Sequence, residues 1–418
     1  MKQRREVRLK DITTKITKGT TPTTFGQPFT ESGINFIKAE SVTRDGLIDP
    51  STFAFIDEKT HALLKRSQIE ADDILLTIAG IYLGKVGIAR KEHVPANTNQ
   101  AVAIVRIDKK QALPEYVRYF LFERSTTEYL NILCPQSAQP NLNLTQLGGL
   151  RFLIPPLPTQ RKIAAVLAAY DDLIEANRRR IALLERMAEE LYREWFVRLR
   201  FPGHEKTKRI KGIPVGWTVE KLREVADESS RSTKAGAHLE GRHYLPLEML
   251  GSKQMLPLDH LPYTEAQSSL VTFEQDEFLF GAMRPYQHKV AIAPFAGVTR
   301  GTCFVIRPKQ TERWAWLFLT LFQPTTVDHA MNICNGSDRP YVVWNKGMEK
   351  MPVLVPPLEL TASFDSLVRP MLSAITGFYF LQRNLQRTRD LLLPRLISGK
   401  LPVEDLAIAF PPSMAVNS

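Results

Sequence analysis

The chain has 418 residues, of which 44% are hydrophobic and 24% are charged, values typical of a soluble protein that can hold two or three domains. Its net charge of +11 favours an anionic partner, of which nucleic acid is the commonest. No run of about 18 apolar residues occurs, so we predict no transmembrane helix. The basic start, residues 1–6, lacks the apolar core of a signal peptide. The three cysteines are odd in number and lack zinc-ligand spacing, so we expect free thiols in a cytoplasmic protein.

Residues 1 to about 154 are predicted to form a first module of mixed α and β structure. Short runs of apolar residues predict strands at 34–37, 73–78, 86–89 and 101–105. Residues 114–133 follow the helical period, and we expect them to form one amphipathic helix that faces the core.

A long helix follows the first module. Thr159 is suited to cap it, and residues 160–200 contain no proline or glycine. Apolar or seam residues recur at alternating spacings of four and three, which predicts a helix that coils around a partner. They are Ile163, Leu167, Tyr170, Ile174, Asn177, Ile181, Leu184, Ala188, Leu191 and Trp195. Asn177 would fix the register of pairing, or else it is a surface residue at a frayed seam.

The second half of the chain repeats the first. Pro155-Pro156-Leu157 recurs as Pro356-Pro357-Leu358, a shift of 201 residues (356 − 155 = 201). Residues 73–89 align with 277–293, and the helical region 114–133 has its counterpart at 313–331. The order is module, long helix, module, long helix, which indicates an internal duplication.

Moving the first seam forward by 201 residues gives a second, degraded seam. Its members are Phe364, Val368, Met371, Ile375, Phe378, Gln382, Leu385, Arg389, Leu392 and Leu396. Pro370 and Pro394 fall inside it, and we expect a kink or break at each because proline removes a helical hydrogen bond. Two matched helices separated by a globular segment can pair antiparallel within one chain.

Motifs of an active site are missing from the sequence. Residues 80–85 resemble a phosphate-binding loop, but three residues instead of four separate the two glycines, and Val86 stands where a metal-binding hydroxyl is needed. His238 and His243 lie near metal-ligand spacing, but in a glycine-containing loop. We therefore predict neither a catalytic residue nor a metal site.

Residues 283–289 lie between two strand-like runs and are predicted to form a DNA-contacting hairpin loop. Arg284 can read guanine and Gln287 can read adenine in the major groove, while Lys289 can hold a phosphate. A structural role for Lys289 is equally compatible, because Lys289 aligns with a lysine of the first module. Tyr286 and His288 complete this set of DNA-binding candidates.

Other polar loops hold further DNA-binding candidates. They are Thr20, Thr21, Lys38, Asn97, Asn99, Gln100, Gln139 and Asn141 in the first module, and Arg300, Ser337 and Arg339 in the second. Amides and hydroxyls at such positions either read base edges or build turns, and the sequence does not decide between these roles. Lys206, Lys208, Arg209 and Lys211 are most simply a solvated basic linker that can touch phosphates without reading sequence.

The residues around the proline-rich junction carry a family resemblance. Pro155-Pro-Leu-Pro-Thr-Gln160-Arg161-Lys162-Ile163, entering a long helix and repeated in weaker form after a second module, resembles the specificity subunit of type I restriction-modification enzymes. The segments that begin at Asp73 and Glu277 resemble parts of its target-recognition domains. The second junction departs from the pattern, because Glu359-Leu360-Thr361 replaces Thr159-Gln160-Arg161.

The resemblance implies an α+β fold with two similar mixed α/β target-recognition domains. Two long helices would separate them and pair as an antiparallel intramolecular coiled coil with pseudo-twofold symmetry. We expect recognition domains at 1–156 and 202–357, spacer helices at 157–201 and 358–404, and a tail at 405–418.

The function that the resemblance implies is sequence-specific DNA binding without catalysis by this chain. Each domain would read half of a bipartite site in double-stranded DNA, and the helices would set the spacing and dock two methyltransferase subunits. Those subunits would hold S-adenosylmethionine, and motor-nuclease subunits would hold ATP and Mg. This chain would bind no cofactor directly and no membrane.

One alternative is a coiled-coil scaffold with two protein-binding modules and no DNA readout. Another is a self-sufficient DNA enzyme.

Overall fold

The structure, a computed structural model, describes residues 4–80, 83–134, 141–229, 231–267, 269–336 and 338–414. Contacts within the chain divide it into two compact units. Unit 1 comprises residues 1–175 together with 383–418, and unit 2 comprises residues 176–382. Each unit therefore contains one globular module and a stretch of each long helix.

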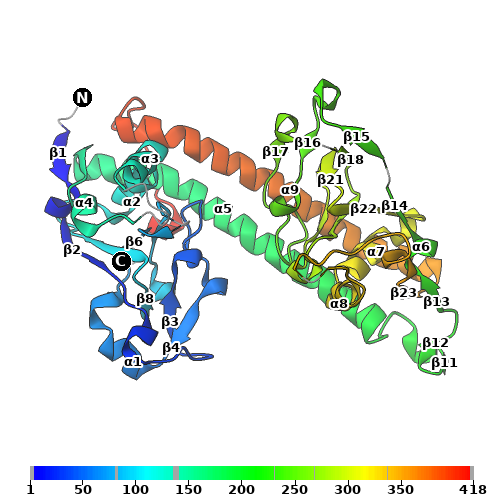
Figure 1. Ribbon diagram of the computed structural model, residues 1–418. Coiled ribbons are helices and arrows are strands. Elements are labelled where there is room, and N and C mark those ends of the chain that lie inside the picture. The colour runs from blue at the N-terminus through cyan, green and yellow to red at the C-terminus, as the bar shows by residue number, and fades with distance from the viewer. Residues whose placement is uncertain are drawn as a thin grey trace. The chain divides into compact units, whose positions relative to one another are not determined.

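Among its described residues, unit 1 forms two four-stranded sheets and a separate antiparallel strand pair, β1-β10 (Figure 1). The first sheet has the order β2-β9-β6-β7. The second has the order β4-β3-β8-β5, with β3 and β8 parallel. The strands are β1 (Arg5–Arg8), β2 (Thr13–Lys18), β3 (Ile34–Ile37), β4 (Ala54–Ile56), β5 (Gln68–Ile69), β6 (Ile74–Thr77), β7 (Val86–Ile88), β8 (Ala96–Thr98), β9 (Val102–Ile107) and β10 (Arg151–Ile154). Two short helices, α1 (Glu58–Leu63) and α4 (Leu144–Gly148), complete the module.

The described part of unit 2 repeats this strand order. The order β14-β22-β19-β20 corresponds to β2-β9-β6-β7, and β13-β23 corresponds to β1-β10. The order β17-β16-β21-β18 corresponds to β4-β3-β8-β5, with β15 added at the edge. The strands are β11 (Arg209–Ile210), β12 (Ile213–Pro214), β13 (Thr218–Lys221), β14 (Ala226–Glu228), β15 (Ser232–Lys234), β16 (His243–Tyr244), β17 (Leu261–Pro262), β18 (Ser269–Phe273), β19 (Phe278–Gly281), β20 (Val290–Ile292), β21 (Gly297–Arg300), β22 (Cys303–Pro308) and β23 (Pro352–Val355). The duplication predicted from the sequence is confirmed by this shared topology.

The repeat extends to single hydrogen bonds. The β6–β7 and β19–β20 hairpins both follow an aspartate, Asp72 or Asp276, with left-handed φ values of 72° and 67°. The amides of these two residues donate to the carbonyl oxygens of Ala89 and Ala293, at 2.8 and 2.9 Å. The two modules therefore share local geometry as well as strand order.

Residues 114–133 form two helices, so the prediction of a single helix is wrong. α2 (Pro114–Phe122) ends at Glu123, whose ψ of 136° is extended, and α3 (Arg124–Ile132) follows. The Glu123 carboxylate accepts a hydrogen bond from the Thr126 amide and caps α3, which stabilises the break.

The counterpart in unit 2 is divided at the same place. α7 (Trp314–Leu321) is followed by α8 (Pro324–Asn332). Pro324 stands at the start of α8, where a helix needs no amide hydrogen from it. A further short helix, α6 (Leu222–Val225), links β13 to β14.

The second long helix is not broken by the two prolines inside it. α5 spans Leu157–Tyr192, so Thr159 lies inside its first turn and is not its cap. α9 spans Leu358–Ser398 as one helix, and the expected break at Pro370 or Pro394 does not occur in it. Both prolines lie on the exposed side of α9, where the carbonyl that loses its partner can bond to water.

The two long helices pair antiparallel within each unit (Figure 1). In unit 1, Leu167 in the early part of α5 shares a core with Leu393 in the late part of α9. In unit 2, Phe196 lies in a π-helical turn, Arg193–Val197, that extends α5. Its ring packs edge-on against Phe364 in the early part of α9, with ring centroids 4.8 Å apart.

All twenty residues of the two predicted seams are buried or half-buried. At some seam positions the next residue in the chain is buried more deeply than the predicted one. In α5, for example, Asp171 is buried whereas the predicted Tyr170 is half-buried. In α9, Leu372 and Tyr379 are likewise buried more deeply than the predicted residues before them, Met371 and Phe378. The buried stripe drifts along the helices because the helical period of about 3.6 residues exceeds the heptad average of 3.5.

Unit 1 buries a cluster of charges between its module and both helices. The carboxylate of Asp171 on α5 accepts hydrogen bonds from Arg389 of α9 at 2.7 Å and from Arg118 of α2. The Tyr119 hydroxyl donates to the same carboxylate at 2.6 Å. Burial alone would raise the pKa of Asp171, but the two guanidinium groups hold this pKa below its ordinary value.

Unit 2 has an apolar version of this cluster. At a shift of 201 residues, the positions of Arg118 and Asp171 are taken by Leu319 and Leu372, and the position of Arg389 is taken by Ala188. The three apolar residues are all buried. The same fold therefore accepts either charged or apolar side chains at this buried position between the module and the two long helices.

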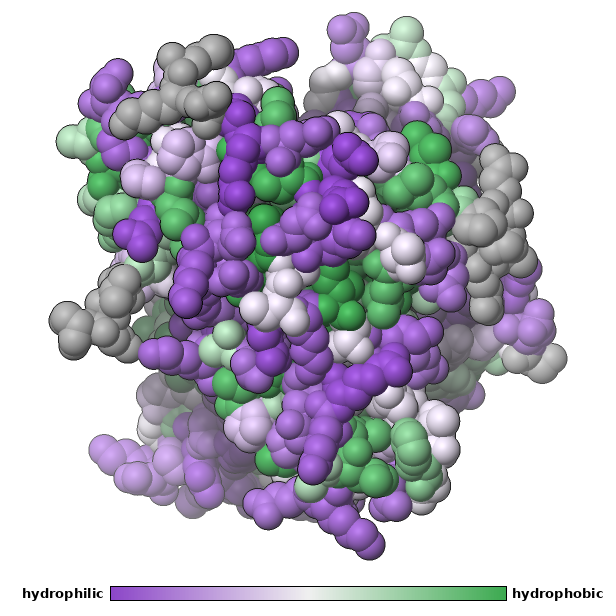
Figure 2. Space-filling view, turned by 90° about the vertical axis from the view of Figure 1, so that its left-hand side faces the viewer, coloured by the Kyte–Doolittle hydropathy of each residue, from purple (hydrophilic) through white to green (hydrophobic). Residues whose placement is uncertain are grey.

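Among the residues that the structure describes, no helix is both long enough and apolar enough to cross a lipid bilayer. Figure 2 shows hydrophilic side chains over much of the face that it draws, with hydrophobic side chains in separate patches between them.

Candidate nucleic-acid interface

The loop between β19 and β20 presents three of its predicted DNA-binding side chains to solvent. Arg284 and Tyr286 are exposed, and Gln287 is half-buried. Arg284 adopts a left-handed conformation with φ of 51°, and its amide donates to the carbonyl oxygen of Pro340 at 2.7 Å. The loop is therefore held by its main chain, which leaves the side chains free to contact a ligand.

His288 and Lys289 of the same loop are used inside the module. His288 is 5% exposed, and its Nε2 bonds to the carbonyl oxygen of Phe322 at 2.9 Å. Burial lowers the pKa of His288. The Lys289 ammonium donates to the carbonyl oxygen of Leu247 at 2.9 Å. We therefore correct His288 from a DNA-binding candidate to a residue that shapes the loop, while the bond of Lys289 favours the structural role that the sequence also allowed.

Arg300 and Arg339 lie on segments joined to this loop. The Ala282 amide donates to the carbonyl oxygen of Thr302 at 2.9 Å, which brings the end of β21 alongside. Arg300 and Arg339 are both exposed, and Ser337 lies outside the described residues. Arg284, Arg300 and Arg339 thus supply cations on three adjacent segments of one module.

Tyr341 belongs to the same group, although the sequence did not single it out. It forms a β-bridge with Met283, directly before Arg284, and its side chain is 46% exposed. An exposed aromatic ring beside an arginine suits contact with a base or a sugar. The available signal was its place in the segment that repeats residues 139–141.

In unit 1, four predicted residues come together at one loop pair. The Thr20 amide donates to the carbonyl oxygen of Thr98 at 2.9 Å, and the Thr21 hydroxyl bonds to the side chain of Gln100. The Asn99 side chain accepts a hydrogen bond from the Ala101 amide at 3.2 Å. Gln100 is exposed and Thr20, Thr21 and Asn99 are half-buried.

Lys38 lies beside this loop pair, because it follows β3 and β3 pairs with β8. Its ammonium lies 2.8 Å from Glu40, in a partly exposed ion pair. Asn141 is exposed and forms a β-bridge with Ala79, while Gln139 lies outside the described residues.

Asn97 is buried, so it is corrected to a structural residue. Its side chain is 0% exposed, and its amide donates to the carbonyl oxygen of Leu64 at 3.0 Å and to the hydroxyl of Ser67 at 3.1 Å. Its oxygen bonds to His61. Every polar atom of this amide is satisfied inside the module, which leaves none for a base edge.

The two modules build their loops with the same main-chain bonds. The Ile78 amide donates to Ala101 at 2.8 Å, as the Ala282 amide donates to Thr302. The Leu142 amide donates to the carbonyl oxygen of Ile78 at 2.8 Å. In the second module, the Val342 amide makes the corresponding bond to the carbonyl oxygen of Ala282 at 2.9 Å. A common scaffold therefore carries different side chains in the two modules: hydroxyls and amides in unit 1, arginines and tyrosines in unit 2.

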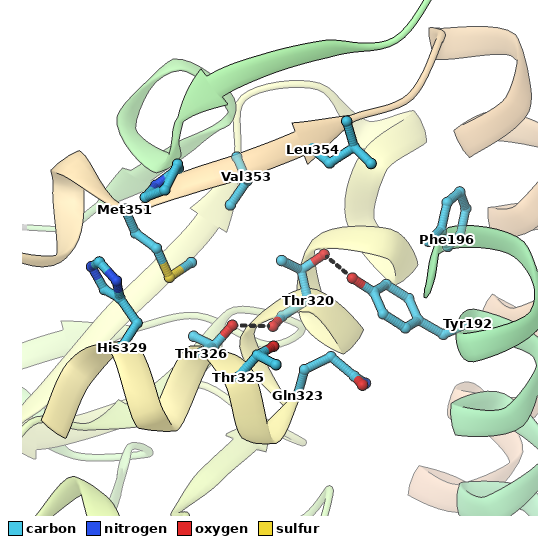
Figure 3. Close-up of a pocket in the computed structure, with 11 residues that line it drawn as sticks. Tyr192, Phe196, Thr320, Gln323, Thr325, Thr326, His329, Met351, Val353 and Leu354 are labelled. Atoms are coloured by element: carbon cyan, nitrogen blue, oxygen red, sulfur yellow. Dashed lines mark hydrogen bonds between the residues drawn. The ribbon is translucent and has the colours of Figure 1, made fainter. Parts of the chain in front are cut away.

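A pocket of about 230 Å³ lies in unit 2 where α5 ends, lined also by α8 and β23 (Figure 3). The Tyr192 and Thr320 hydroxyls bond to each other at 3.0 Å, and the Thr326 hydroxyl donates to the Thr320 carbonyl oxygen at 2.6 Å. Burial lowers the pKa of His329 at its wall. These hydroxyl groups are engaged in internal bonds, which gives them a structural role.

Within the described ranges, no group of three or more His, Cys, Asp or Glu side chains is placed to hold a metal ion.

Comparison with known proteins gives consistent matches. The family model described as "Type I restriction modification DNA specificity domain" matches residues 1–186. The type I restriction enzyme MjaIX specificity subunit of Methanocaldococcus jannaschii is 25% identical over 338 residues, which cover 78% of this chain and 76% of that protein. The putative MjaX specificity subunit of the same organism is 22% identical over 415 residues, 96% of this chain and 94% of that protein.

Among solved structures, the type I restriction-modification S subunit from M. genitalium matches with a TM-score of 0.59 and 14% identity. The match covers 95% of this chain and 96% of that one, and it supports the fold alone. The duplicated fold is that of this S-subunit structure, and the sequence matches favour a protein with DNA sequence specificity. The chain is thus similar in its first 186 residues to the type I restriction modification DNA specificity domain, and over most of its length to type I restriction enzyme specificity subunits. A coiled-coil scaffold without DNA readout is not favoured.

Proposed function

We propose that residues 1–156 and 202–357 each read one half of a bipartite DNA site. The observation that carries this proposal is the common loop scaffold with different exposed side chains. Arg284 and Tyr286 occupy the second module's loop, while Thr21 and Gln100 mark the first module's loop pair. Because arginine favours guanine and amides favour adenine, we expect the two half-sites to differ in sequence.

The spacer segments 157–201 and 358–404, which contain α5 (Leu157–Tyr192) and α9 (Leu358–Ser398), set the distance between the half-sites. The 36 residues of α5 correspond to about 54 Å at 1.5 Å per residue. Half-sites are then about one to two DNA turns apart, at roughly 35 Å per turn. The same helices dock two methyltransferase subunits.

The partner subunits carry out catalysis, and this chain selects the DNA sequence on which they act. The complex works in the cytoplasm. The methyltransferase subunits hold S-adenosylmethionine, and motor-nuclease subunits hold ATP and Mg. The names of the matched relatives support an assembly of this kind, since each is the specificity subunit of a restriction enzyme.

Selection of DNA duplexes from a random library tests the proposal. The full chain, together with its methyltransferase subunits, should enrich a bipartite sequence. Arg284→Ala should cost about 1–3 kcal/mol of binding and relax one position of one half-site. Arg223→Ala is the matched control, because Arg223 is exposed in the same unit and pairs with Glu224. If no sequence is enriched, the chain is not a DNA reader, and if Arg284→Ala behaves like the control, this loop does not read a base.

A further inference from the structure

The basic segment after α5 is a folded β-hairpin and not a flexible linker. β11 and β12 pair antiparallel, with Arg209 opposite Pro214 and Ile210 opposite Ile213 (Figure 1). The two residues between the strands are Lys211 and Gly212, with left-handed φ values of 50° and 83°. Such a two-residue turn matches the twist of a hairpin and gives it a defined shape.

The base of the hairpin is anchored in the core of unit 2. Trp217 is 7% exposed, and its ring lies 5.4 Å from that of Phe201, so the two ends of the segment pack together. The Val215 amide donates to the carbonyl oxygen of Lys208 at 2.9 Å, and the Trp217 amide donates to that of Pro214 at 3.1 Å. The hairpin is therefore held in place from both sides.

Four cations of this segment, Lys206, Lys208, Arg209 and Lys211, are exposed. In the part of the chain that the structure describes, none of the four takes part in an ion pair, whereas nearby Arg198 pairs with Glu190 of α5 and with Glu194 of the π-helical turn. Unpaired cations gathered on a fixed frame favour a polyanionic partner, because like charges held together repel one another until a counter-charge arrives.

The outward-facing residues of the hairpin add nothing to the core, although Ile213 packs against it. Ile210 is 66% exposed and Val215 is 52% exposed, so neither contributes to the packing of unit 2. The residues that follow α9 in unit 1, described over 399–414, form no strand. The hairpin is thus an addition to one half of the duplication.

We propose that this hairpin binds the phosphate backbone of duplex DNA and adds affinity without reading bases. The proposal rests on the proposed function, because it assigns a second contact on the same DNA. Lysine and arginine side chains on a narrow β-hairpin can approach the backbone, and backbone contacts carry no sequence information. Four phosphate contacts would contribute about 0.9 each to the salt dependence of binding, or roughly 3 to 4 in total.

The test compares the full chain with two fourfold variants. In the first, Lys206, Lys208, Arg209 and Lys211 are all replaced by Gln. In the matched control, Lys10, Lys91, Lys110 and Lys400 are replaced by Gln. These four are also exposed and without an ion pair among the described residues, so both variants lose four positive charges. Circular dichroism and thermal unfolding confirm that each variant is folded.

Binding constants are measured by fluorescence anisotropy over a range of salt, on the selected duplex and on an unrelated duplex of equal length. The hairpin variant should lower the slope of the logarithm of the binding constant against the logarithm of salt by roughly 3 on both duplexes. The preference for the selected duplex should stay unchanged.

Two results would overturn the inference while leaving the proposed function intact. One is a salt slope equal to that of the control variant. The other is a lost preference for the selected duplex at unchanged slope, which would mean that the hairpin reads bases. Normal DNA binding combined with weaker capture of a methyltransferase subunit would instead identify an acidic protein surface as the ligand. A wild-type chain that binds neither duplex would overturn the proposed function as well.

Discussion

Replacing the Asp171 carboxylate by an apolar group should destabilise unit 1 more than removing the whole charged cluster. Arg118 and Arg389 are 3% and 1% exposed, so Asp171→Leu leaves the buried Arg118 guanidinium without a carboxylate and leaves Arg389 with only the exposed Asp390 as an ion-pair partner. Breaking a buried ion pair by removing one partner costs about 3–5 kcal/mol. The bond from the Tyr119 hydroxyl is lost as well, and an unsatisfied buried hydroxyl costs about 1–3 kcal/mol.

The fourfold variant Arg118→Met, Tyr119→Phe, Asp171→Leu, Arg389→Met removes every buried charge of the cluster, leaves the exposed carboxylate of Asp390 to water and keeps the volumes similar. Its stability should lie within about 2 kcal/mol of wild type, because apolar replacements of a complete buried ion cluster are often neutral. Unit 2 supports this expectation at three of the four positions, since the counterparts of Arg118, Asp171 and Arg389 are buried leucine or alanine, while Thr320 stands at the position of Tyr119.

Amide hydrogen exchange in α2 reports the local opening free energy and avoids treating the whole chain as one unfolding unit. Glu128→Leu is the control, because Glu128 forms an exposed ion pair with Arg124 and should change stability by less than about 1 kcal/mol. If the fourfold variant loses as much stability as Asp171→Leu, the charges stabilise the unit independently and the reasoning is refuted.

Three further predictions concern other parts of the chain. Burial raises the pKa of Glu185 to about 7, so the folded state binds a proton more tightly than the unfolded state, and the stability of unit 2 should fall as pH rises from about 4.5 to 7. Glu185→Gln keeps an acceptor for the Met255 amide and should flatten this part of a plot of melting temperature against pH; an unchanged slope would contradict the assignment. Gly19→Ala should destabilise unit 1 by about 1–3 kcal/mol in urea unfolding, because the new Cβ would lie 2.1 Å from the Thr98 carbonyl oxygen. Gly301→Ala has open space and serves as its control, and equal effects would disprove the close contact. Insertion of seven residues into each long helix should lengthen the preferred gap by about 10 Å, or roughly three base pairs, with both half-sites unchanged in a methylation map. Altered half-sites at the same gap would argue against spacing by the helices.

The architecture could be predicted because its signals are local or repeated. A strand such as β3 (Ile34–Ile37) was found at the predicted residues, and the shift of about 201 residues located the second module. The long helices followed from their seam, which needs only the spacing of apolar residues. The break at Glu123 could not be predicted, because neither glycine nor proline marks it and its extended backbone is stabilised by a cap that only the fold reveals.

The candidate site was less predictable, because exposure depends on contacts that are distant in sequence. Asn97 and His288 have the residue types of a DNA-binding loop, yet both are buried by segments more than 25 residues away in the chain. Asp171 was missed for the same reason, since its burial among arginines depends on Arg118 and Arg389. Arg284 and Tyr286, by contrast, are exposed in the loop between β19 and β20, where the sequence predicted a hairpin loop.

The main-chain bonds under the two sets of loops have a consequence for how such a chain changes over generations. The bonds at Ile78 and Ala282 involve only peptide groups, so replacement of nearby exposed side chains leaves them in place. Mutations can then accumulate at the loop surface without an equal loss of folding stability. We expect new target preferences to arise by drift in one half of the chain while the other half keeps its own.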